Sequence, residues 1–218
     1  IVSGVNPSGS LHLGHAIIFK ELIKLQKQGA EIFIPISNDE SYITKKANSI
    51  AEAREKSISD IIPSLIALGF DPKKTHINID SDYTDIYNFA IYLSTKLTLN
   101  RVKGVFGFDE LSTPGALFYF GSVQEAHILF PQFQRGKHLS VVPVGIDQDP
   151  FIRLTRDIAV NKDFNLEKPA ALHSKFLPSL KGGAKMSASE GSQLFLSDGP
   201  ATVKNKTASV SVASAQDF

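Results

Sequence analysis

Four short segments at the start of the chain leave few folds open. Residues 1–3 predict the end of a strand, and residues 4–10 form a loop that contains glycine and proline. Apolar residues at helical spacing then predict a helix over 12–28. The β-branched run at 31–36 predicts a second, buried strand. A strand, a loop, a helix and a strand in this order form a unit that implies a parallel sheet.

The rest of the chain continues this alternation. Strands are predicted at 75–79 and 139–146, and helices at 50–68 (kinked at Pro63), 86–97, 122–129 and from Asp149 onward, with Asp149 as N-cap and Pro150 as first helical residue. Loops are predicted at 105–120, around Pro114-Gly115, and at 177–191, and residues 199–218 show no firm periodicity.

Strands alternating with helices predict an α/β fold, a Rossmann-like doubly wound parallel sheet, here with a helical insertion at residues 82–138. Ligands in such sheets bind beyond the carboxyl ends of the strands. We therefore expect the site among the loops that follow Ser3, Ile36 and Ile146.

Composition narrows the function classes. The 218 residues include no cysteine, which excludes disulfides and cysteine-bound zinc. The net charge of +1 gives no bulk basicity, so RNA binding would depend on local patches. No apolar stretch is long enough to span a bilayer and no signal peptide is visible, so we expect no membrane partner and a cytoplasmic location. The chain opens on Ile1 rather than Met, which is typical of a fragment.

The first loop and helix start carry the motif Pro-Ser-Gly-Ser-Leu-His-Leu-Gly-His at residues 7–15. His12 and His15 stand three residues apart and share one helical face, and Gly9 and Gly14 permit close approach of a ligand. A helix start offers unpaired N–H groups and a positive dipole end, which suit phosphate. Glycines that only shape a turn, histidines that only cap the helix, and a metal site remain alternatives.

This motif resembles the first signature of class I aminoacyl-tRNA synthetases, and nucleotidylyltransferases carry a related form. The resemblance implies that His12 and His15 contact the phosphates of ATP and that Gly14 makes room for the adenine ring, with Ser8 and Gly9 in the same ATP-binding loop. The first motif alone does not separate the two families.

A second motif, Lys-Met-Ser-Ala-Ser at residues 185–189, lies in a glycine-rich polar stretch. Most stretches of this kind are solvated loops, but this one resembles the Lys-Met-Ser-Lys-Ser signature of class I synthetases. Alanine at its fourth position resembles the eukaryotic and archaeal tryptophanyl branch. The resemblance implies that Lys185 stabilises charge on the departing pyrophosphate and that Met186, Ser187 and Ser189 also bind ATP.

A third segment, residues 145–157, indicates the amino acid. Its Asp-Gln-Asp-Pro run resembles the tryptophanyl branch, because the tyrosyl branch usually follows Asp-Gln with a basic residue. Gln148 is predicted to lie at the carboxyl end of a buried strand and to face the ligand crevice. Alternatively, Asp147 and Asp149 simply cap the next helix.

The same resemblance implies that Glu40, Gln124 and Gln148 hold the ammonium group of the amino acid. A carboxylate and two amide oxygens are suitable acceptors for an ammonium. An exposed acid and an ordinary surface amide are the alternative interpretations of Glu40 and Gln124.

The side-chain pocket departs from the family pattern, because Val2 and Pro35 replace a Tyr and a Gln that contact the indole in eukaryotic members. Bacterial tryptophanyl enzymes place an Asp that accepts the indole N–H where this chain has His127. We hypothesise that neutral His127, on the helical face of Gln124, takes that role. A histidine packed at a subunit interface is the alternative.

These resemblances imply a class I catalytic domain over residues 1–198, with the insertion at 82–138 serving dimerisation, and the start of an anticodon-binding region at 199–218. The implied reaction is ATP-dependent activation of L-tryptophan and its transfer to tRNA(Trp) by a homodimer, with Mg²⁺ neutralising the phosphates. The substrate carboxylate is the nucleophile, so catalysis consists of alignment and charge stabilisation.

Three alternatives remain. They are tyrosyl specificity, a nucleotidylyltransferase on the same fold, and a synthetase-like binding protein that charges no tRNA. The Asp-Gln-Asp-Pro run and the motif at 185–189 argue against the first two, and His12, His15 and Lys185 argue against the third.

Overall fold

The computed structural model describes residues 1–174 and 193–208. The ATP-binding candidates of the second motif, Lys185, Met186, Ser187 and Ser189, lie outside the described residues, as does the predicted loop at 177–191.

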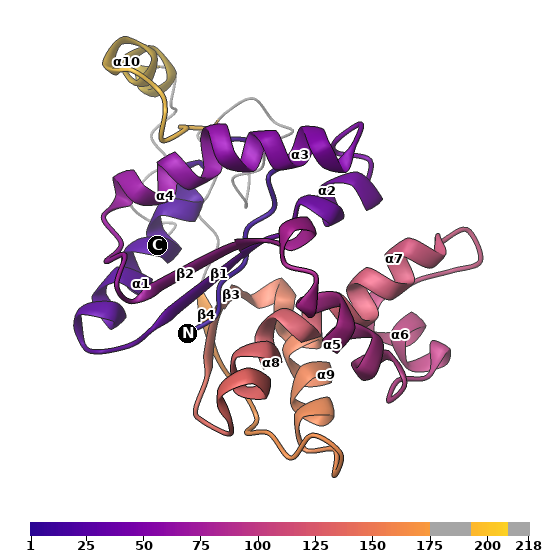
Figure 1. Ribbon diagram of the computed structural model, residues 1–218. Coiled ribbons are helices and arrows are strands. Elements are labelled where there is room, and N and C mark those ends of the chain that lie inside the picture. The colour runs from indigo at the N-terminus through magenta and orange to yellow at the C-terminus, as the bar shows by residue number, and fades with distance from the viewer. Residues whose placement is uncertain (175–192, 209–218) are drawn as a thin grey trace, which may run out of the picture.

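Two pairs of parallel strands lie at the centre of the molecule (Figure 1). Strand β1 (Ile32–Ile36) pairs with β2 (Thr75–Ile79), and β3 (Val141–Gly145) pairs with β4 (Ala170–Ser174).

The first residues of the chain join the two pairs. The amide of Ser3 donates to the carbonyl of Phe33 in β1 at 3.0 Å, and the amide of Val2 donates to the carbonyl of Val141 in β3 at 3.0 Å. The spatial order is therefore β2, β1, the segment 1–5, β3 and β4, which confirms the predicted doubly wound parallel α/β fold. The winding direction reverses between the segment 1–5 and β3.

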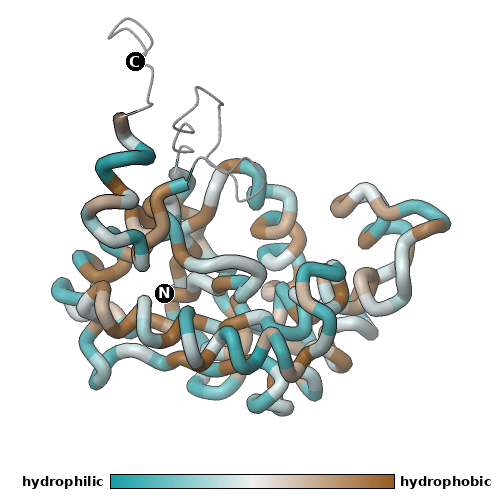
Figure 2. Tube along the Cα trace, turned by 90° about the horizontal axis from the view of Figure 1, so that it is seen from above, coloured by the Kyte–Doolittle hydropathy of each residue, from teal (hydrophilic) through white to brown (hydrophobic). Residues whose placement is uncertain are grey.

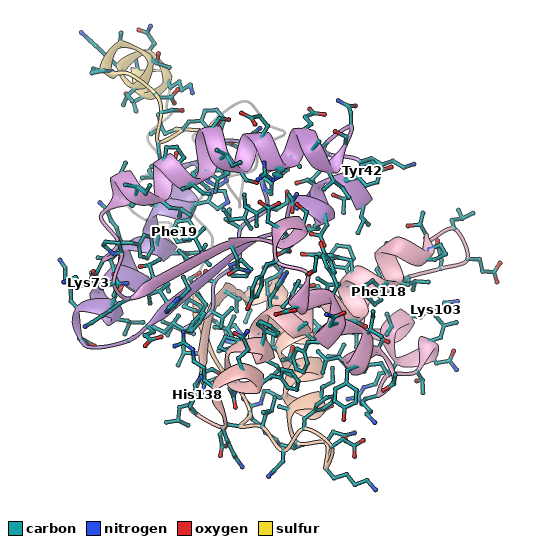
Figure 3. The ribbon with its side chains drawn as sticks, in the orientation of Figure 1. Phe19, Tyr42, Lys73, Lys103, Phe118 and His138 are labelled. Carbon is teal, nitrogen blue, oxygen red and sulfur yellow. The ribbon has the colours of Figure 1, made fainter. Side chains whose placement is uncertain are left out.

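One hydrophobic core lies between β1, β2 and the helices that pack on them. These helices are α1 (Leu13–Lys27), α3 (Ile50–Lys56), a five-residue π-helix η1 (Ser57–Ile61), and α4 (Ile62–Leu68). Phe19 of α1 is buried between these helices and the strands (Figure 3). Its neighbours in the core are mostly leucine and isoleucine, including Leu22, Ile34, Ile61 and Leu65.

A second core belongs to the helical insertion and the helix after β3 (Figure 1). Its elements are α5 (Asp85–Ser94), α6 (Leu99–Phe106), α7 (Pro114–Phe118), the π-helix η3 (Tyr119–Val123), α8 (Gln124–Arg135) and α9 (Asp149–Ala159). Phe89, Leu129 and Leu154 are buried in this core. Hydrophilic and hydrophobic positions are interspersed along the whole trace (Figure 2), as expected for amphipathic helices that pack on a core.

Short elements connect the two cores and complete the chain. They are α2 (Asn38–Ile43), the 3₁₀ turns η2 (Asp80–Asp82) and η4 (Ile146–Gln148), and the outlying helix α10 (Pro200–Ala208). Within the described part of the chain, no helix is both long and apolar enough to cross a membrane.

Several predicted boundaries are wrong for local reasons. Gln148, not Asp149, is the N-cap of α9, because the Asp149 carboxylate instead contacts Arg153 at 2.6 Å and His173 at 3.2 Å. The segment around Pro114 forms helix α7 rather than a turn, because the Thr113 side chain accepts from the amide of Ala116 and caps it.

The long helix predicted at 50–68 is interrupted by the π-helix η1 rather than kinked at Pro63, which lies in the first turn of α4. Part of the stretch 199–218, which shows no periodicity, forms α10. The helices α2 and α6 and the strand β4 were not predicted by the apolar pattern, since all are short.

Candidate active site

A cavity of about 410 Å³ opens at the point where the winding direction of the sheet reverses. It lies beyond the carboxyl ends of the segment 1–5 and β3, as expected for this fold. Its wall contains all four residues predicted to bind the amino acid, and both positions at which we expect a departure from the family pattern. These residues are Glu40, Gln124, His127 and Gln148, and Val2 and Pro35.

Three of these residues gather hydrogen-bond acceptors. The Gln124 amide donates to Oε1 of Gln148 at 3.5 Å, and Oε1 of Gln124 is buried with no partner among the described residues. Oε2 of Glu40 accepts from the Tyr119 hydroxyl at 3.3 Å. An unpaired buried acceptor and a carboxylate that line the same cavity favour a ligand with a cationic N–H donor.

His127 is buried on α8 and pairs with a carboxylate that the sequence did not single out. Its Nε2 lies 2.8 Å from Oδ2 of Asp80, which is fully buried in η2. Burial alone would lower the pKa of His127, but the charge and hydrogen bond of Asp80 and the charges of Asp39 and Glu40 outweigh it, so the pKa is raised. A raised pKa favours the imidazolium and not the neutral ring that we expected.

Asp39 is a second buried carboxylate of this cluster. It accepts from the Tyr87 hydroxyl at 2.9 Å and from the amide of Glu40 at 2.8 Å. Burial, and then the charge of Asp80, raise the pKa of Asp39 to about 7. Sequence reasoning missed Asp39, Asp80 and Tyr87, because only their positions at the carboxyl ends of β1 and β2 and in α5 bring them together.

The two histidines of the first motif cap helix α1 reciprocally. Nδ1 of His12 accepts from the amide of Gly14 at 3.1 Å, and Nδ1 of His15 accepts from the amide of His12 at 3.2 Å. The ring centroids are 3.9 Å apart. A ring nitrogen that accepts from a backbone N–H carries no proton, so the proton of each neutral ring is on Nε2. Capping therefore leaves each histidine with one donor for a ligand.

Both imidazoles are neutral in a wide pH range. Burial lowers the pKa of His12. Burial, and then the charge of His12, lower the pKa of His15 to about 4. The pair therefore offers N–H donors rather than cations, with a helix dipole behind them.

The expectation of unpaired N–H groups at this helix start is wrong. The amide of His12 donates to Nδ1 of His15 at 3.2 Å, and that of His15 to the carbonyl of His12 at 2.9 Å. The amide of Leu13 donates to the carbonyl of Leu194 at 2.8 Å, and that of Gly14 to His12. The chain after the second motif thus lies against the first motif, and His12 forms an antiparallel bridge with Phe195.

The glycines of the motif have different surroundings. A Cβ on Gly14 would lie 2.9 Å from Cε1 of His12, so this position needs glycine for the histidine ring itself. A Cβ on Gly9 would meet nothing within 4 Å. Ser8, also in this loop, is exposed, and the next serine, Ser10, donates to Oδ2 of Asp60 in η1 at 2.7 Å.

The sequence is similar to those of known proteins. A family model described as class I tRNA synthetases (W and Y) matches residues 1–218. A tryptophan–tRNA ligase of Halobacterium salinarum is 40% identical over 208 residues, which cover 94% of this chain and 53% of that protein. One from Methanocaldococcus jannaschii is 38% identical over 213 residues, 94% of this chain and 56% of that protein.

Solved structures show the same likeness. Tryptophanyl-tRNA synthetase of Aeropyrum pernix superposes with a TM-score of 0.86 at 34% identity, covering 94% of this chain and 56% of that one. The enzyme of Encephalitozoon cuniculi bound to tryptophan gives 0.85 at 27% identity, covering 97% and 61%. The chain spans about half the length of the curated relatives it matches.

Proposed function

This chain belongs to the class I tRNA synthetases of the tryptophan and tyrosine family, and from that premise we propose that it activates L-tryptophan with ATP and transfers it to tRNA(Trp). The cavity at the reversal point of the sheet carries this proposal. In it, acceptors suited to an amino-acid ammonium group lie on the carboxyl side of the same sheet whose first loop leads to the capped histidine pair.

The proposed ammonium site consists of Glu40, Gln124 and Gln148. The carboxylate supplies the negative charge that favours an ammonium group. Oε1 of Gln124 is buried without a partner, so a hydrogen bond from the ligand would offset the cost of burying it. Nζ of Lys46 lies 4.0 Å from Oε1 of Glu40, and this lysine side chain is half exposed. A long, exposed ion pair of this kind is weak, so it leaves the carboxylate able to bind an ammonium group.

The proposed ATP site begins at the capped histidines. Their Nε2–H groups are the donors for phosphate oxygens, in a loop that also contains Ser8, Gly9 and Gly14. Negative charge grows on these oxygens as the substrate carboxylate attacks the α-phosphate and pyrophosphate leaves, and fixed donors stabilise it without reorganisation. Lys185, Met186, Ser187 and Ser189 are proposed to complete this site from outside the described residues.

Mg²⁺ is proposed to enter with the triphosphate. Among the described residues, no group of three His, Asp or Glu side chains is placed to hold a metal ion. ATP phosphates and water are ordinary Mg²⁺ ligands, so we propose that the nucleotide and water molecules supply the ligands of the ion.

The proposed indole site is the apolar part of the cavity, where Val2, Ile128 and Phe151 line the wall. His127 is the proposed acceptor for the indole N–H. Replacing His127 with Ala should raise the KM for tryptophan roughly tenfold or more, with a much smaller change in the KM for ATP. Steady-state exchange kinetics with each substrate varied in turn measure both values. Equal rises in the two would contradict a role in amino-acid recognition.

Amino-acid-dependent ATP–pyrophosphate exchange, run with each of the twenty amino acids, tests the proposed function. Exchange that depends on tryptophan alone supports it. Exchange with tyrosine and not tryptophan would replace the proposed specificity, and exchange with neither would favour a binding protein that charges no tRNA.

The wider organisation is proposed on the same basis. Residues 1–198 would form the catalytic domain, with residues 82–138 at the interface of a homodimer, and 199–218 would begin an anticodon-binding region. A cytoplasmic location is proposed for the reaction. Sedimentation of the purified chain at micromolar concentration measures the dimer directly.

A further inference from the structure

The buried pair of His127 and Asp80 lies at the cavity proposed to bind the amino acid. His127 lines the cavity, whereas Asp80 lies behind it and is fully buried. Nε2 of His127 is hydrogen-bonded to Oδ2 of Asp80 at a distance of 2.8 Å. Nδ1 is therefore the ring nitrogen that remains for a ligand. A fully buried carboxylate is costly unless it is paired, and this one is placed where it fixes the orientation of one side chain of the pocket.

The groups that face His127 are mostly anionic or acceptors. They come from three elements: Asp80 from η2, Asp39 and Glu40 from α2, and the Tyr119 ring, 6.4 Å away, from η3. This environment favours the imidazolium, which carries a proton on both ring nitrogens. An imidazolium only donates, and an indole N–H also only donates, so the two cannot pair.

The substrate changes this balance when it enters. Its ammonium group, held by Glu40 and the two glutamines, is a second cation in the same cavity. A like charge nearby disfavours the protonated form of an imidazole. Loss of the proton on Nδ1 then creates the one hydrogen-bond acceptor that the indole N–H requires.

Resting on the proposed function, we propose that tryptophan binds with release of one proton from His127 to solvent, Nδ1 then accepting from the indole N–H while Asp80 keeps the remaining proton on Nε2. The only covalent bond that breaks is Nδ1–H, whose electron pair stays on nitrogen. Asp80 is a positioning residue, and the pair makes amino-acid affinity depend on pH.

Asp39 is the competing source of a proton. It titrates near neutral pH and lies in the same cluster, so an entering cation favours its ionised form as well. The variants must therefore separate the two groups. H127Q keeps a side-chain acceptor that does not titrate, D39N removes the competing carboxyl, and D80N removes the charge that favours the imidazolium.

Binding is measured without catalysis. The chain contains no tryptophan, so fluorescence excited outside the tyrosine band comes from the ligand alone, and its change on binding gives the Kd. Calorimetric titration of L-tryptophan in two buffers of different ionisation enthalpy counts the protons released. Both are run from about pH 5 to about pH 8, the range in which histidine titrates.

We expect the wild-type Kd for tryptophan to fall by up to about tenfold per pH unit on the acid side of the transition, with close to one proton released there. H127Q should release none and show a flat profile. D39N should still release the proton, with its transition at a lower pH because the charge of Asp39 helps to raise the pKa of His127. D80N should shift the profile to lower pH, a change that a purely structural role would not give.

A ligand without the N–H provides the matched probe. In 3-benzothienyl-L-alanine, sulfur replaces the indole N–H. The wild type should prefer tryptophan over this analogue increasingly as pH rises, whereas H127Q should show a constant preference. Absence of proton release in the wild type, an unchanged release in H127Q, or its loss in D39N would each overturn the inference. Tryptophan that binds and supports exchange without releasing a proton leaves the proposed function standing, whereas absence of tryptophan-dependent exchange removes the function itself.

Discussion

Gly14 lacks a side chain for a reason that lies within the protein. A Cβ there would lie 2.9 Å from Cε1 and 3.0 Å from Nδ1 of His12, so G14A must displace the ring that caps α1. We expect G14A to lower kcat/KM for ATP roughly tenfold to a hundredfold, because a displaced donor no longer meets the phosphate. Exchange kinetics at varied ATP concentration measure the loss. The family resemblance, which implies that Gly14 makes room for the adenine ring, also predicts a lower kcat/KM.

G9A is the matched control for this change. A Cβ on Gly9 meets nothing within 4 Å, so the thermal midpoint of G9A should equal that of the wild type. G14A should lower the midpoint because the His12 cap is disturbed. Equal midpoints for G14A and the wild type would show that the histidine ring adapts freely, contrary to the prediction.

Asp39 should make stability fall as pH rises. Its pKa is raised from 3.8 to about 7 in the folded chain, so between these pH values the folded state holds a proton that the unfolded state has lost. Stability from this group is therefore present below about pH 4 and is lost as pH rises through about 7.

The D39N variant removes this titration. We expect its free energy of unfolding, relative to the wild type, to increase by on the order of 1 kcal/mol between pH 5 and pH 8. Urea unfolding of both proteins at the two pH values measures it, and the linkages of groups outside the cluster of Asp39, Asp80 and His127 cancel in the difference. A constant difference between the variants would show that Asp39 titrates normally.

The π-helix η1 positions the first motif from outside it. It projects Asp60 toward the loop, where the carboxylate accepts from the hydroxyl of Ser10 at 2.7 Å. π-helical turns are rare and often occur at functional sites. We expect S10A and D60A each to raise the KM for ATP a few-fold, and the double variant to be no worse than either, a coupling of about 1 kcal/mol.

The exposed pair of Glu21 and Lys24 on α1 serves as the control for this cycle. Both side chains are at least half exposed, and such pairs contribute little. E21A and K24A should therefore leave exchange kinetics unchanged. Additive effects of S10A and D60A would show that their hydrogen bond does not transmit anything to the ATP site.

The sequence predicted the elements whose apolar spacing is long and regular. Helix α1 and strands β1 and β2 lie where expected. Glu40 and Gln148 follow β1 and β3 as expected, but they lie in α2 and η4 rather than in loops. The π-helices η1 and η3 could not be predicted, because an extra residue in a turn leaves the apolar pattern almost unchanged.

The residues of the site could be predicted only where a sequence motif contains them. Motif resemblance identified His127 and Gln124, which the structure places on one wall of the cavity. It did not identify Asp80, which lies 47 positions away in the chain and meets His127 only through the packing of η2 against α8. In the sequence, Asp80 looks like an ordinary turn residue after a strand, and nothing indicates that it is buried.

Across the molecule, the cavity lies between two separate hydrophobic cores. A bound amino acid would contact α2 on the side of β1 and α8 on the side of the insertion, and so would oppose their separation. We expect L-tryptophan at about a hundred times its Kd to stabilise the chain by about 2.7 kcal/mol. Urea unfolding followed by far-ultraviolet circular dichroism measures this increase.

L-Tyrosine at the same concentration is the control and should leave the unfolding midpoint unchanged. Hydrogen exchange shows which elements the ligand stabilises. Amides of α2, η3 and α8 should gain protection together. Protection confined to α8 would contradict a ligand that bridges the two cores.

The separation of the two cores also affects how such a protein can diversify. The capped histidines belong to the side of β1, whereas His127, Ile128 and Phe151 belong to the side of the insertion and α9. Mutations in the part of the pocket formed by α8 and α9 therefore leave unchanged the half that is proposed to bind the nucleotide. The preferred side chain of the substrate can change in this way while the capped histidines are inherited unchanged.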